Sequence, residues 1–289
     1  MKKPVFSGVC TALVTPFFNN QINYPLLQQM LHWQHEQGIN AVVLAGTTGE
    51  APTLSDSEKI NLFAKGKEYA NTNCRIIAGT GSNSTAHAIQ LSKAAEAVGA
   101  DALLVVSPYY NKGNKQGLFD HFAAIAQAVS IPVILYNVPG RTGVDIPVEV
   151  YKMLSSIPNI AGVKEASTCI GKIAQIRNAC PDDFYIWSGN DDLVVPAMSL
   201  GAIGVISVLS NVFPAETAAM TAAALAGDFK TAGSIQCKML PLIDALFCEV
   251  NPIPVKYAMK YCGFDCGPCR LPLGAPAEET SERIDNLFQ

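Results

Sequence analysis

Lys164 is the residue whose position most strongly suggests chemistry. It closes the apolar run 160–163 and is the only lysine in any of eight short apolar runs along the chain. If this run is a buried strand, burial favours the neutral amine over the ammonium form. A neutral lysine amine is the nucleophile that forms a Schiff base with a carbonyl compound. The alternative is an ion pair with Glu165, but adjacent residues of a strand point to opposite faces, so that pair is poorly placed.

Hydroxyl side chains follow other apolar runs at the same kind of position. Tyr136, Tyr110 and Thr47 all stand where such a run ends. A chain of hydroxyls can carry a proton between a Schiff base and bulk water. Each of them also has an ordinary explanation, because a tyrosine can simply turn its hydroxyl to solvent and a Thr-Thr-Gly sequence can simply form a turn. Together with Lys164 they indicate an acid–base relay.

Arg141 is the candidate for binding an anion. It follows Val138-Pro139-Gly140, which predicts a rigid turn after an apolar run. A guanidinium there could bind a carboxylate through two parallel hydrogen bonds. A solvated surface arginine is the equally open alternative.

We expect neither a metal nor an organic cofactor. The sequence contains no G-x-G-x-x-G or Walker motif and no carboxylate cluster. The histidines all fall in helical patterns: His32, His35, His87 and His121. The spacing of Cys262, Cys266 and Cys269 could suit zinc, but no nearby Cys or His supplies a fourth ligand.

Composition narrows the class of protein further. Of the 289 residues 49% are hydrophobic and 15% charged, which excludes a disordered chain and suggests that surface is lost to partner subunits. The net charge of −4 makes nucleic acid an improbable partner. Nine cysteines, mostly isolated in apolar runs, indicate reduced thiols and a cytoplasmic protein. We expect no signal peptide and no membrane-spanning segment.

The elements that must position these residues follow one repeating pattern, in which a short apolar run precedes a longer stretch of helical period. The predicted strands are Val9–Pro16, Ala41–Gly46, Arg75–Gly79, Ala102–Pro108, Pro132–Asn137, Ile160–Lys164, Phe184–Ser188 and Ala202–Val208. They lack apolar/polar alternation, as expected for parallel strands covered by helices. Eight such units predict a (β/α)8 TIM barrel, with the active site at the carboxyl ends of the strands. A doubly wound open sheet is the alternative.

Signals for helix ends support this division of the chain. Ser55 and Glu58 form a capping box, and Asn83-Ser84 begins a helix that runs through Val98. Gly38, Gly99 and Gly201 each follow a helical stretch and precede a strand. We expect the catalytic barrel to occupy residues 1–226. Residues 227–289 then form a C-terminal helical extension packed on the barrel.

Three motifs in this order resemble the 4-hydroxy-tetrahydrodipicolinate synthase family of pyruvate-dependent class I aldolases. They are Gly46-Thr47-Thr48-Gly49-Glu50, Tyr136-Asn137-Val138-Pro139-Gly140-Arg141-Thr142-Gly143 and Gly162-Val163-Lys164-Glu165-Ala166. The resemblance extends from Gly8 through Asn251-Pro252-Ile253-Pro254-Val255-Lys256 to Arg270-Leu271-Pro272. It implies condensation of pyruvate with L-aspartate 4-semialdehyde, an early step of lysine and diaminopimelate biosynthesis.

The resemblance also implies roles for individual residues. Lys164 matches the lysine that forms the Schiff base with pyruvate, and Tyr136 matches the residue that passes protons. Thr47 and Tyr110 match its relay partners. In the family the tyrosine at the Tyr110 position crosses from a neighbouring subunit, so we expect a homo-oligomer, commonly a dimer of dimers.

Three further positions match substrate-binding residues of the family. Thr48 matches the residue that binds the pyruvate carboxylate, and Ile206 matches a position whose backbone carbonyl contacts pyruvate. Arg141 matches the residue that binds the carboxylate of the semialdehyde.

The same resemblance leaves two related enzymes as alternatives, N-acetylneuraminate lyase and keto-deoxy sugar-acid aldolase. A barrel retained only for binding is an alternative of another class.

Lysine inhibition is where the sequence departs from the family pattern. The matching inhibitor-site positions are Ala51, Asp56, Lys59, Asn83, His87 and Tyr109. Inhibited members carry a glutamate at the His87 position, which holds the lysine ammonium. Because His87 offers no such anion and Lys59 adds a repelling charge, we expect weak or absent inhibition by lysine.

Overall fold

The strands close into a single parallel barrel in the computed structural model, which describes residues 1–70 and 73–288. Its strands are β1 (Gly8–Ala12), β4 (Ala41–Leu44), β5 (Arg75–Gly79), β6 (Ala102–Val106), β7 (Val133–Asn137), β8 (Ile160–Glu165), β9 (Tyr185–Ser188) and β10 (Gly204–Ser207). Each pairs with the next in chain order, and β10 returns to β1. All eight predicted strands are present, and the predicted (β/α)8 barrel is confirmed.

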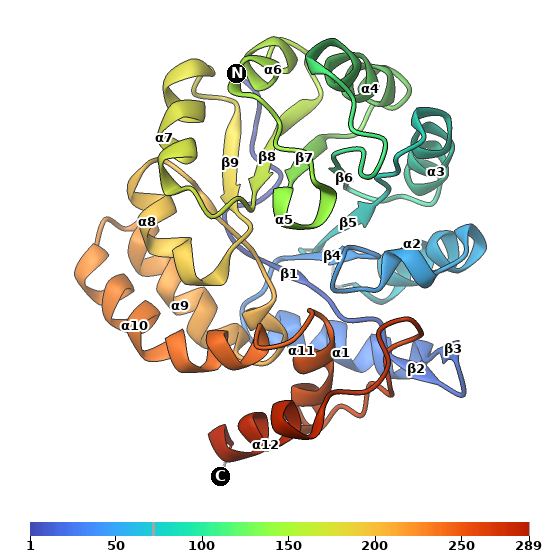
Figure 1. The fold of residues 1–289 in the computed structure, drawn as a ribbon, viewed down its shortest axis with the longest axis vertical. Helices are drawn as coiled ribbons and strands as arrows, with labels where there is room; N and C mark the ends of the chain where they lie inside the picture. Colours follow the sequence, from blue (N-terminus) through green and yellow to red (C-terminus); the bar gives the residue numbers. More distant parts are fainter. Residues whose placement is uncertain (71–72, 289) are drawn as a thin grey trace.

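Helices surround the barrel on its outer side (Figure 1). They are α1 (Tyr24–Glu36), α2 (Asp56–Tyr69), α3 (Thr85–Ala97), α4 (Lys115–Gln127), α6 (Val148–Leu154), α7 (Ile170–Ala179), α8 (Val194–Ser199) and α9 (Pro214–Leu225). The Ser55 capping box at the start of α2 is confirmed. The left-handed conformation at Gly38, Gly99 and Gly201, with φ of 88°, 88° and 97°, ends the helices before three strands.

Several short elements were not predicted. β2 (Phe17–Phe18) and β3 (Gln21–Ile22) form an antiparallel hairpin. The first barrel strand ends at Ala12 and not at the predicted Pro16. Strands of two residues carry no periodic signal. The other short elements are α5 (Pro139–Thr142) and the 3-10 turns η1 (Ala51–Thr53), η2 (Asp191–Leu193), η3 (Leu209–Asn211) and η4 (Met259–Cys262).

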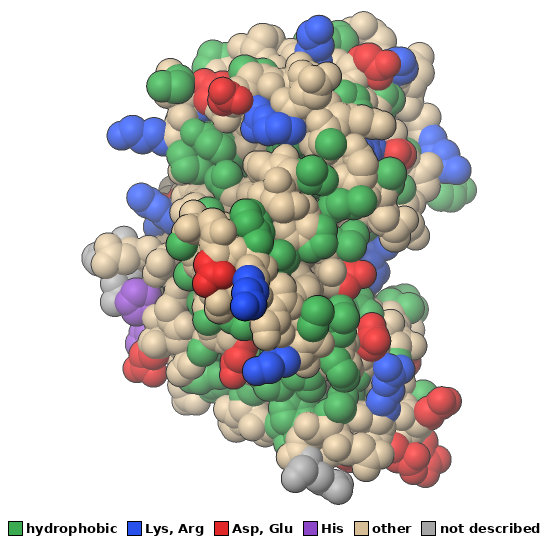
Figure 2. Space-filling model, turned by 90° about the vertical axis from the view of Figure 1, so that its left-hand side faces the viewer, with side chains coloured by type: hydrophobic (Ala, Val, Ile, Leu, Met, Phe, Trp, Pro, Cys, Tyr) green, Lys and Arg blue, Asp and Glu red, His purple; other side chains and the backbone are tan. Residues whose placement is uncertain are grey.

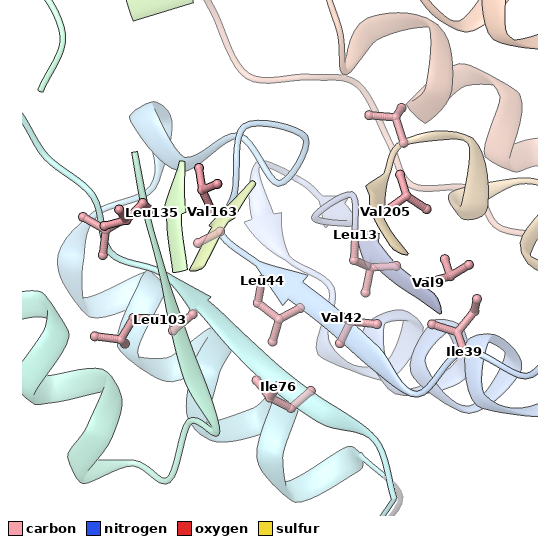
Figure 3. Packing of buried hydrophobic residues seen from close by; sticks show 14 of the residues in the cluster. Val9, Leu13, Ile39, Val42, Leu44, Ile76, Leu103, Leu135, Val163 and Val205 are labelled. Carbon is pink, nitrogen blue, oxygen red and sulfur yellow. The ribbon is translucent and has the colours of Figure 1, made fainter. Parts of the chain in front are cut away.

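Both faces of the barrel strands are buried, which explains why the sequence shows no alternation. Val42 and Leu44 of β4 face outward and pack with the helices, in the cluster shown in Figure 3. Ala41 and Val43 face inward, where they join a second cluster that includes Trp187. Apolar residues on both faces of a strand stabilise it only when helices cover the outside.

The chain after α9 forms the expected helical extension. It comprises α10 (Phe229–Leu246), α11 (Ile253–Ala258) with η4, and α12 (Glu278–Leu287). α10 packs against α8 and α9, and α12 packs against α10 and α11. Figure 1 shows these helices, in orange and red, gathered on one side of the barrel. The boundary between residues 226 and 227 stays a prediction.

A buried ion pair joins the extension to the barrel. Nζ of Lys256 on α11 lies 2.6 Å from Oε1 of Glu50, which follows β4. The two side chains are 2% and 0% exposed. The second carboxylate oxygen accepts a hydrogen bond from the backbone N–H of Arg270 at 2.8 Å. The Glu50 carboxylate therefore fixes the loop after β4 relative to α11 and to the chain around Arg270.

The molecular surface carries charges of both signs. Figure 2 shows acidic and basic side chains dispersed among hydrophobic and neutral ones on one face. Within the described ranges, no helix is both long and apolar enough to cross a membrane.

We predict that Lys256→Met strongly destabilises the fold. The substitution leaves the Glu50 carboxylate buried without its cation, which costs about 3–5 kcal/mol when one partner of such a pair is removed. The double variant Glu50→Gln/Lys256→Met removes both charges and should recover most of that loss. Urea unfolding at pH 7 measures both. A single variant as stable as the wild type, or a double variant no better than the single, would contradict the prediction.

Candidate active site

A cleft opens at the carboxyl ends of the strands. It comprises an outer cavity of about 280 Å³ and an inner cavity of about 160 Å³, and the two share part of their lining. The shared residues are Gly46, Thr47, Leu104, Tyr136, Val138 and Arg141. Lys164 and Thr48 line the inner cavity. The structure thus brings together five of the seven residues that the sequence analysis selected.

Lys164 and Tyr136 lie side by side inside the barrel. They are register partners on β8 and β7, and Nζ of Lys164 lies 4.4 Å from the centre of the Tyr136 ring. The side chains are buried, with exposed fractions of 5% and 7%. In the described part of the chain, Nζ of Lys164 has no ion-pair partner, and the Glu165 carboxylate is bound by Asn137 instead. The ion-pair alternative for Lys164 is therefore wrong.

An irregularity in β8 determines which face Lys164 occupies. Val133 of β7 pairs with Ile160, but the next residue, Ile134, pairs with Gly162, so Ala161 is an extra residue in β8. Ile160 faces outward, and four residues further along a regular strand the side chain would face outward again. The bulge reverses this alternation and directs Lys164 inward.

Gly162 is the residue that permits the bulge. Its φ is 156°, and a Cβ atom there would lie 1.8 Å from the backbone oxygen of Tyr185. No residue with a side chain fits between β8 and β9 at that distance. The Gly-Val-Lys order of the third motif therefore has a direct structural reason.

The loop after β4 presents two threonines to the cleft. Thr47 lines both cavities, and Thr48 is buried with its hydroxyl accepting a hydrogen bond from Nδ2 of Asn251 at 3.1 Å. The hydroxyl of Thr15 donates to the backbone oxygen of Gly49 at 2.7 Å. Glu50 closes the loop with a φ of 58° and holds Lys256. The threonines are thus presented by a loop anchored at several points.

Arg141 lies at the entrance, but its local structure differs from the prediction. It belongs to the short helix α5, with Pro139 in the first turn, and not to a plain turn. It lines both cavities, and its Nη2 donates to the backbone oxygen of Asn251 at 3.0 Å. Arg141 is solvent-exposed, and this hydrogen bond orients its guanidinium at the mouth of the cleft.

The sequence analysis missed Asn251 and Phe247, which line the inner cavity from the extension. Asn251 contacts both Thr48 and Arg141, and its Oδ1 is buried without a hydrogen-bond partner in the described ranges. They lie roughly 90 residues beyond Lys164, where strand counting offers no guidance. A polar residue directly before Pro252 in an apolar stretch is the only local signal that could have indicated Asn251.

Two selected residues do not line this cleft. Tyr110 follows β6, is 89% exposed and has a φ of 70°. Its neighbour Tyr109 lines the outer cavity. Ile206 is fully buried on β10 and belongs to the same inner cluster as Tyr136.

Asp191 is a buried carboxyl group near Lys164 that the sequence motifs do not include. Burial raises its pKa above the ordinary value for aspartate, and hydrogen bonds from Ser207 and from the backbone of Leu209 and Val208 oppose that rise. Its Oδ2 accepts hydrogen bonds from the backbone N–H groups of Val208 and Leu209, both at 2.9 Å. Asp191 thereby fixes the chain that leaves β10.

The cysteines and histidines offer no obvious metal ligands. Burial raises the pKa of Cys266 and of Cys269 to about 12, and that of Cys262 to about 11, so these thiols stay protonated at neutral pH. No group of three or more His, Cys, Asp or Glu residues that could hold a metal ion occurs in residues 1–70 and 73–288.

His87 is engaged with an acidic neighbour. Its Nε2 lies 2.8 Å from Oδ2 of Asp56, and its Nδ1 lies 3.1 Å from the hydroxyl oxygen of Ser82. Lys59 lines the outer cavity, where burial lowers its pKa from the usual lysine value. Weak or absent inhibition by lysine stays a prediction.

Comparisons with known proteins agree on one family. A family model described as the dihydrodipicolinate synthetase family matches residues 5–289. A 4-hydroxy-tetrahydrodipicolinate synthase of Acetivibrio thermocellus is 47% identical over 100% of this chain and 98% of its own length. Among solved structures, the dihydrodipicolinate synthase of Aquifex aeolicus is 40% identical with a TM-score of 0.96, over 98% of this chain and 97% of its own. The enzyme of Cyanidioschyzon merolae, solved with lysine bound, is 41% identical with a TM-score of 0.95, over the same shares.

We predict that Gly189→Ala impairs the reactivity of Lys164. An added Cβ would lie 2.5 Å from Cβ of Ala166 and 3.1 Å from Cε of Lys164, so the chain after β8 must shift. The rate at which borohydride traps a small carbonyl compound on Lys164 should fall at least about tenfold, because displacement by about 1 Å costs that much or more. The control is Gly233→Ala in α10, where an added Cβ meets open space. Trapping of the Gly189→Ala variant at the control's rate would refute the prediction.

Proposed function

The chain belongs to the dihydrodipicolinate synthetase family, and on this premise we propose how its residues condense pyruvate with L-aspartate 4-semialdehyde. The product is 4-hydroxy-tetrahydrodipicolinate, and the reaction is an early step of lysine and diaminopimelate biosynthesis. The enzyme is a lyase that uses a class I aldolase mechanism, with a lysine Schiff base in place of a metal. The observation that carries the proposal is the buried amine of Lys164 against the ring of Tyr136 in the cleft.

Lys164 performs the covalent step. Its amine adds to the carbonyl carbon of pyruvate, and water leaves as the imine forms. Tyr136 and Thr47 pass the protons that this step requires, because both line the cavity that holds the amine.

Thr48 and Arg141 bind the two carboxylates. Thr48 binds that of pyruvate next to Lys164, and the backbone carbonyl of Ile206 contacts the same substrate. Arg141 binds the carboxylate of the semialdehyde at the entrance, where a guanidinium can donate two parallel hydrogen bonds. The contacts of Asn251 with both residues support this arrangement, because they hold the two binding groups at a constant separation.

Carbon–carbon bond formation follows from the enamine. Loss of a proton from the methyl carbon of the imine gives an enamine, whose carbon attacks the aldehyde of the second substrate. The amino group of that substrate then attacks the imine carbon and displaces the amine of Lys164. Ring closure releases the product and restores the free lysine.

Tyr110 completes the relay from a second subunit. It is exposed and lines neither cavity of its own chain, while Tyr109 beside it lines the outer cavity. These observations support an oligomer in which Tyr110 enters the neighbouring active site, and the assembly common in the family, a dimer of dimers, is the one proposed. A dimer interface over this loop also accounts for the low share of charged residues.

The related aldolases are not favoured as alternatives. N-acetylneuraminate lyase and keto-deoxy sugar-acid aldolases share the lysine and the tyrosine but act on other substrates. The relatives described above carry the synthase name over nearly the whole chain. Activity with pyruvate and the semialdehyde, measured against cleavage of sialic acid, distinguishes the two functions.

The Schiff base is tested by trapping it. Borohydride added with pyruvate should attach the reduced pyruvate group to Lys164, detected by peptide mass spectrometry, because reduction of an imine gives a stable amine. Lys164→Ala should lose the adduct. Lys93→Ala, which removes an exposed helical lysine, is the matched control and should keep it. Absence of an adduct in the native protein, or an adduct on another lysine, argues against the proposal.

The crossing of Tyr110 is tested by mixing subunits. Lys164→Ala and Tyr110→Phe should each have low activity alone. If Tyr110 acts across the dimer, a hybrid of the two variants contains one complete site, so its activity should be roughly half that of the wild type. Co-expression with two affinity tags isolates the hybrid. A hybrid no more active than the mean of its parents means that Tyr110 does not complete the partner's site.

A further inference from the structure

Glu165 is a buried carboxylate that the mechanism does not use. It is 3% exposed and lines neither cavity of the cleft. Its oxygens accept hydrogen bonds from Nδ2 of Asn137 at 2.9 and 3.1 Å, from the Tyr151 hydroxyl at 3.1 Å and from the backbone N–H of Ser167 at 2.8 Å. In the described ranges it forms no ion pair. A carboxyl group that is buried outside the cleft and bound by three separate residues calls for a structural explanation.

The strand register places this carboxylate directly behind the reactive pair. Tyr136 is the register partner of Lys164, and Asn137 is the register partner of Glu165. Because successive side chains of a strand alternate between faces, the first pair faces the cleft and the second pair faces the helices. The hydrogen bond between Asn137 and Glu165 therefore joins the same two strands one residue beyond the two reacting groups.

The carboxylate also joins helices to this end of the strands. Tyr151 lies on α6 and is fully buried, and burial together with the nearby Glu165 carboxylate raises its pKa well above the usual tyrosine value. It therefore stays a hydrogen-bond donor at neutral pH. Asn137 extends the network through Nδ2 to Asp145 at 2.8 Å, and its Oδ1 accepts the N–H of Ile146 at 3.0 Å. Lys172 of α7 pairs with Asp145.

We propose that Glu165 is a positioning residue for the reaction. Its carboxylate, with Asn137 and Tyr151, holds the ends of β7 and β8 so that the Tyr136 hydroxyl and the Lys164 amine keep the geometry of proton transfer. Glu165 touches neither substrate nor cleft and acts only through the two strands. The inference rests on the function proposed above, because it concerns the rate of imine formation on Lys164.

Imine formation depends on this geometry more than substrate binding does. Proton transfer needs the two groups within hydrogen-bond reach of the same substrate atom, and a displacement of about 1 Å can cost on the order of a hundredfold in rate. Thr48, which is proposed to bind the pyruvate carboxylate, lies after β4 and is outside the Glu165 network. Loosening the network should therefore lower the rate at saturating pyruvate and change the KM for pyruvate little.

Two variants and a matched control test the inference. Glu165→Gln keeps the shape but turns an amide donor toward Nδ2 of Asn137 and toward either the Ser167 N–H or the Tyr151 hydroxyl. Tyr151→Phe removes one donor. Tyr185→Phe is the matched control. Tyr185 lies on β9, next to β8, and the substitution removes a tyrosine hydrogen bond of 2.8 Å to the backbone oxygen of Lys2, which is outside the network. For each, we would measure urea unfolding, the KM for pyruvate and the rate of borohydride-trapped adduct formation at saturating pyruvate.

We expect adduct formation to slow by about 10–100-fold in Glu165→Gln and by about 3–10-fold in Tyr151→Phe. In both variants the KM for pyruvate should stay within about threefold of the wild-type value. The Tyr185→Phe control should form the adduct at a rate near that of the wild type. Rates equal to that of the control, or a loss confined to the KM, overturn the inference. If Glu165→Gln does not fold, Tyr151→Phe decides alone. An adduct missing from the wild type would refute the proposed function instead, so the two failures are distinguishable.

Discussion

The register between β7 and β8 is the constraint on which the rest of the structure depends. One bulge, at Ala161, places Lys164 inside the barrel opposite Tyr136, and it places Glu165 outside opposite Asn137. A shift of β8 by one residue would turn Lys164 toward the helices and Glu165 toward the cleft, since strand side chains alternate between faces with a period of two. The bulge in turn requires Gly162, where backbone of β9 leaves no space for a side chain. The positions of Lys164, of Tyr136 and of the network behind them thus follow from one local irregularity.

The extension completes what the barrel begins. Barrel strands can present side chains to a cleft, but the loops that follow them need anchors if a site is to hold a fixed geometry. Glu50 after β4 is anchored by Lys256, while Thr48 and Arg141 both contact Asn251. All three anchoring contacts cross from the barrel to the extension. The last 60-odd residues therefore contact the residues that line the cleft, although they lie outside the repeating β/α units.

The sequence was most informative where one physical signal dominates. Continuous apolar runs predicted all eight barrel strands, because both faces of each are buried, and the Ser55 capping box and the helix-ending glycines were found through local backbone chemistry. It was uninformative where structure depends on contacts distant in sequence. The hairpin of β2 and β3 is too short for a periodic signal, and α5 around Arg141 read as a turn. Asn251 and Phe247 reach the cleft only through the path of the extension, which no local pattern encodes.

The central claim is that the buried amine of Lys164 is the group that binds pyruvate covalently, next to the Tyr136 hydroxyl. A crystal structure of the protein soaked in pyruvate tests it most directly. The account predicts continuous electron density from Nζ of Lys164 to the second carbon of pyruvate, with the carboxylate at Thr48 and the Tyr136 hydroxyl within hydrogen-bond distance of the new bond. Pyruvate bound in the cleft with an unmodified Lys164, or joined to another residue, would contradict it.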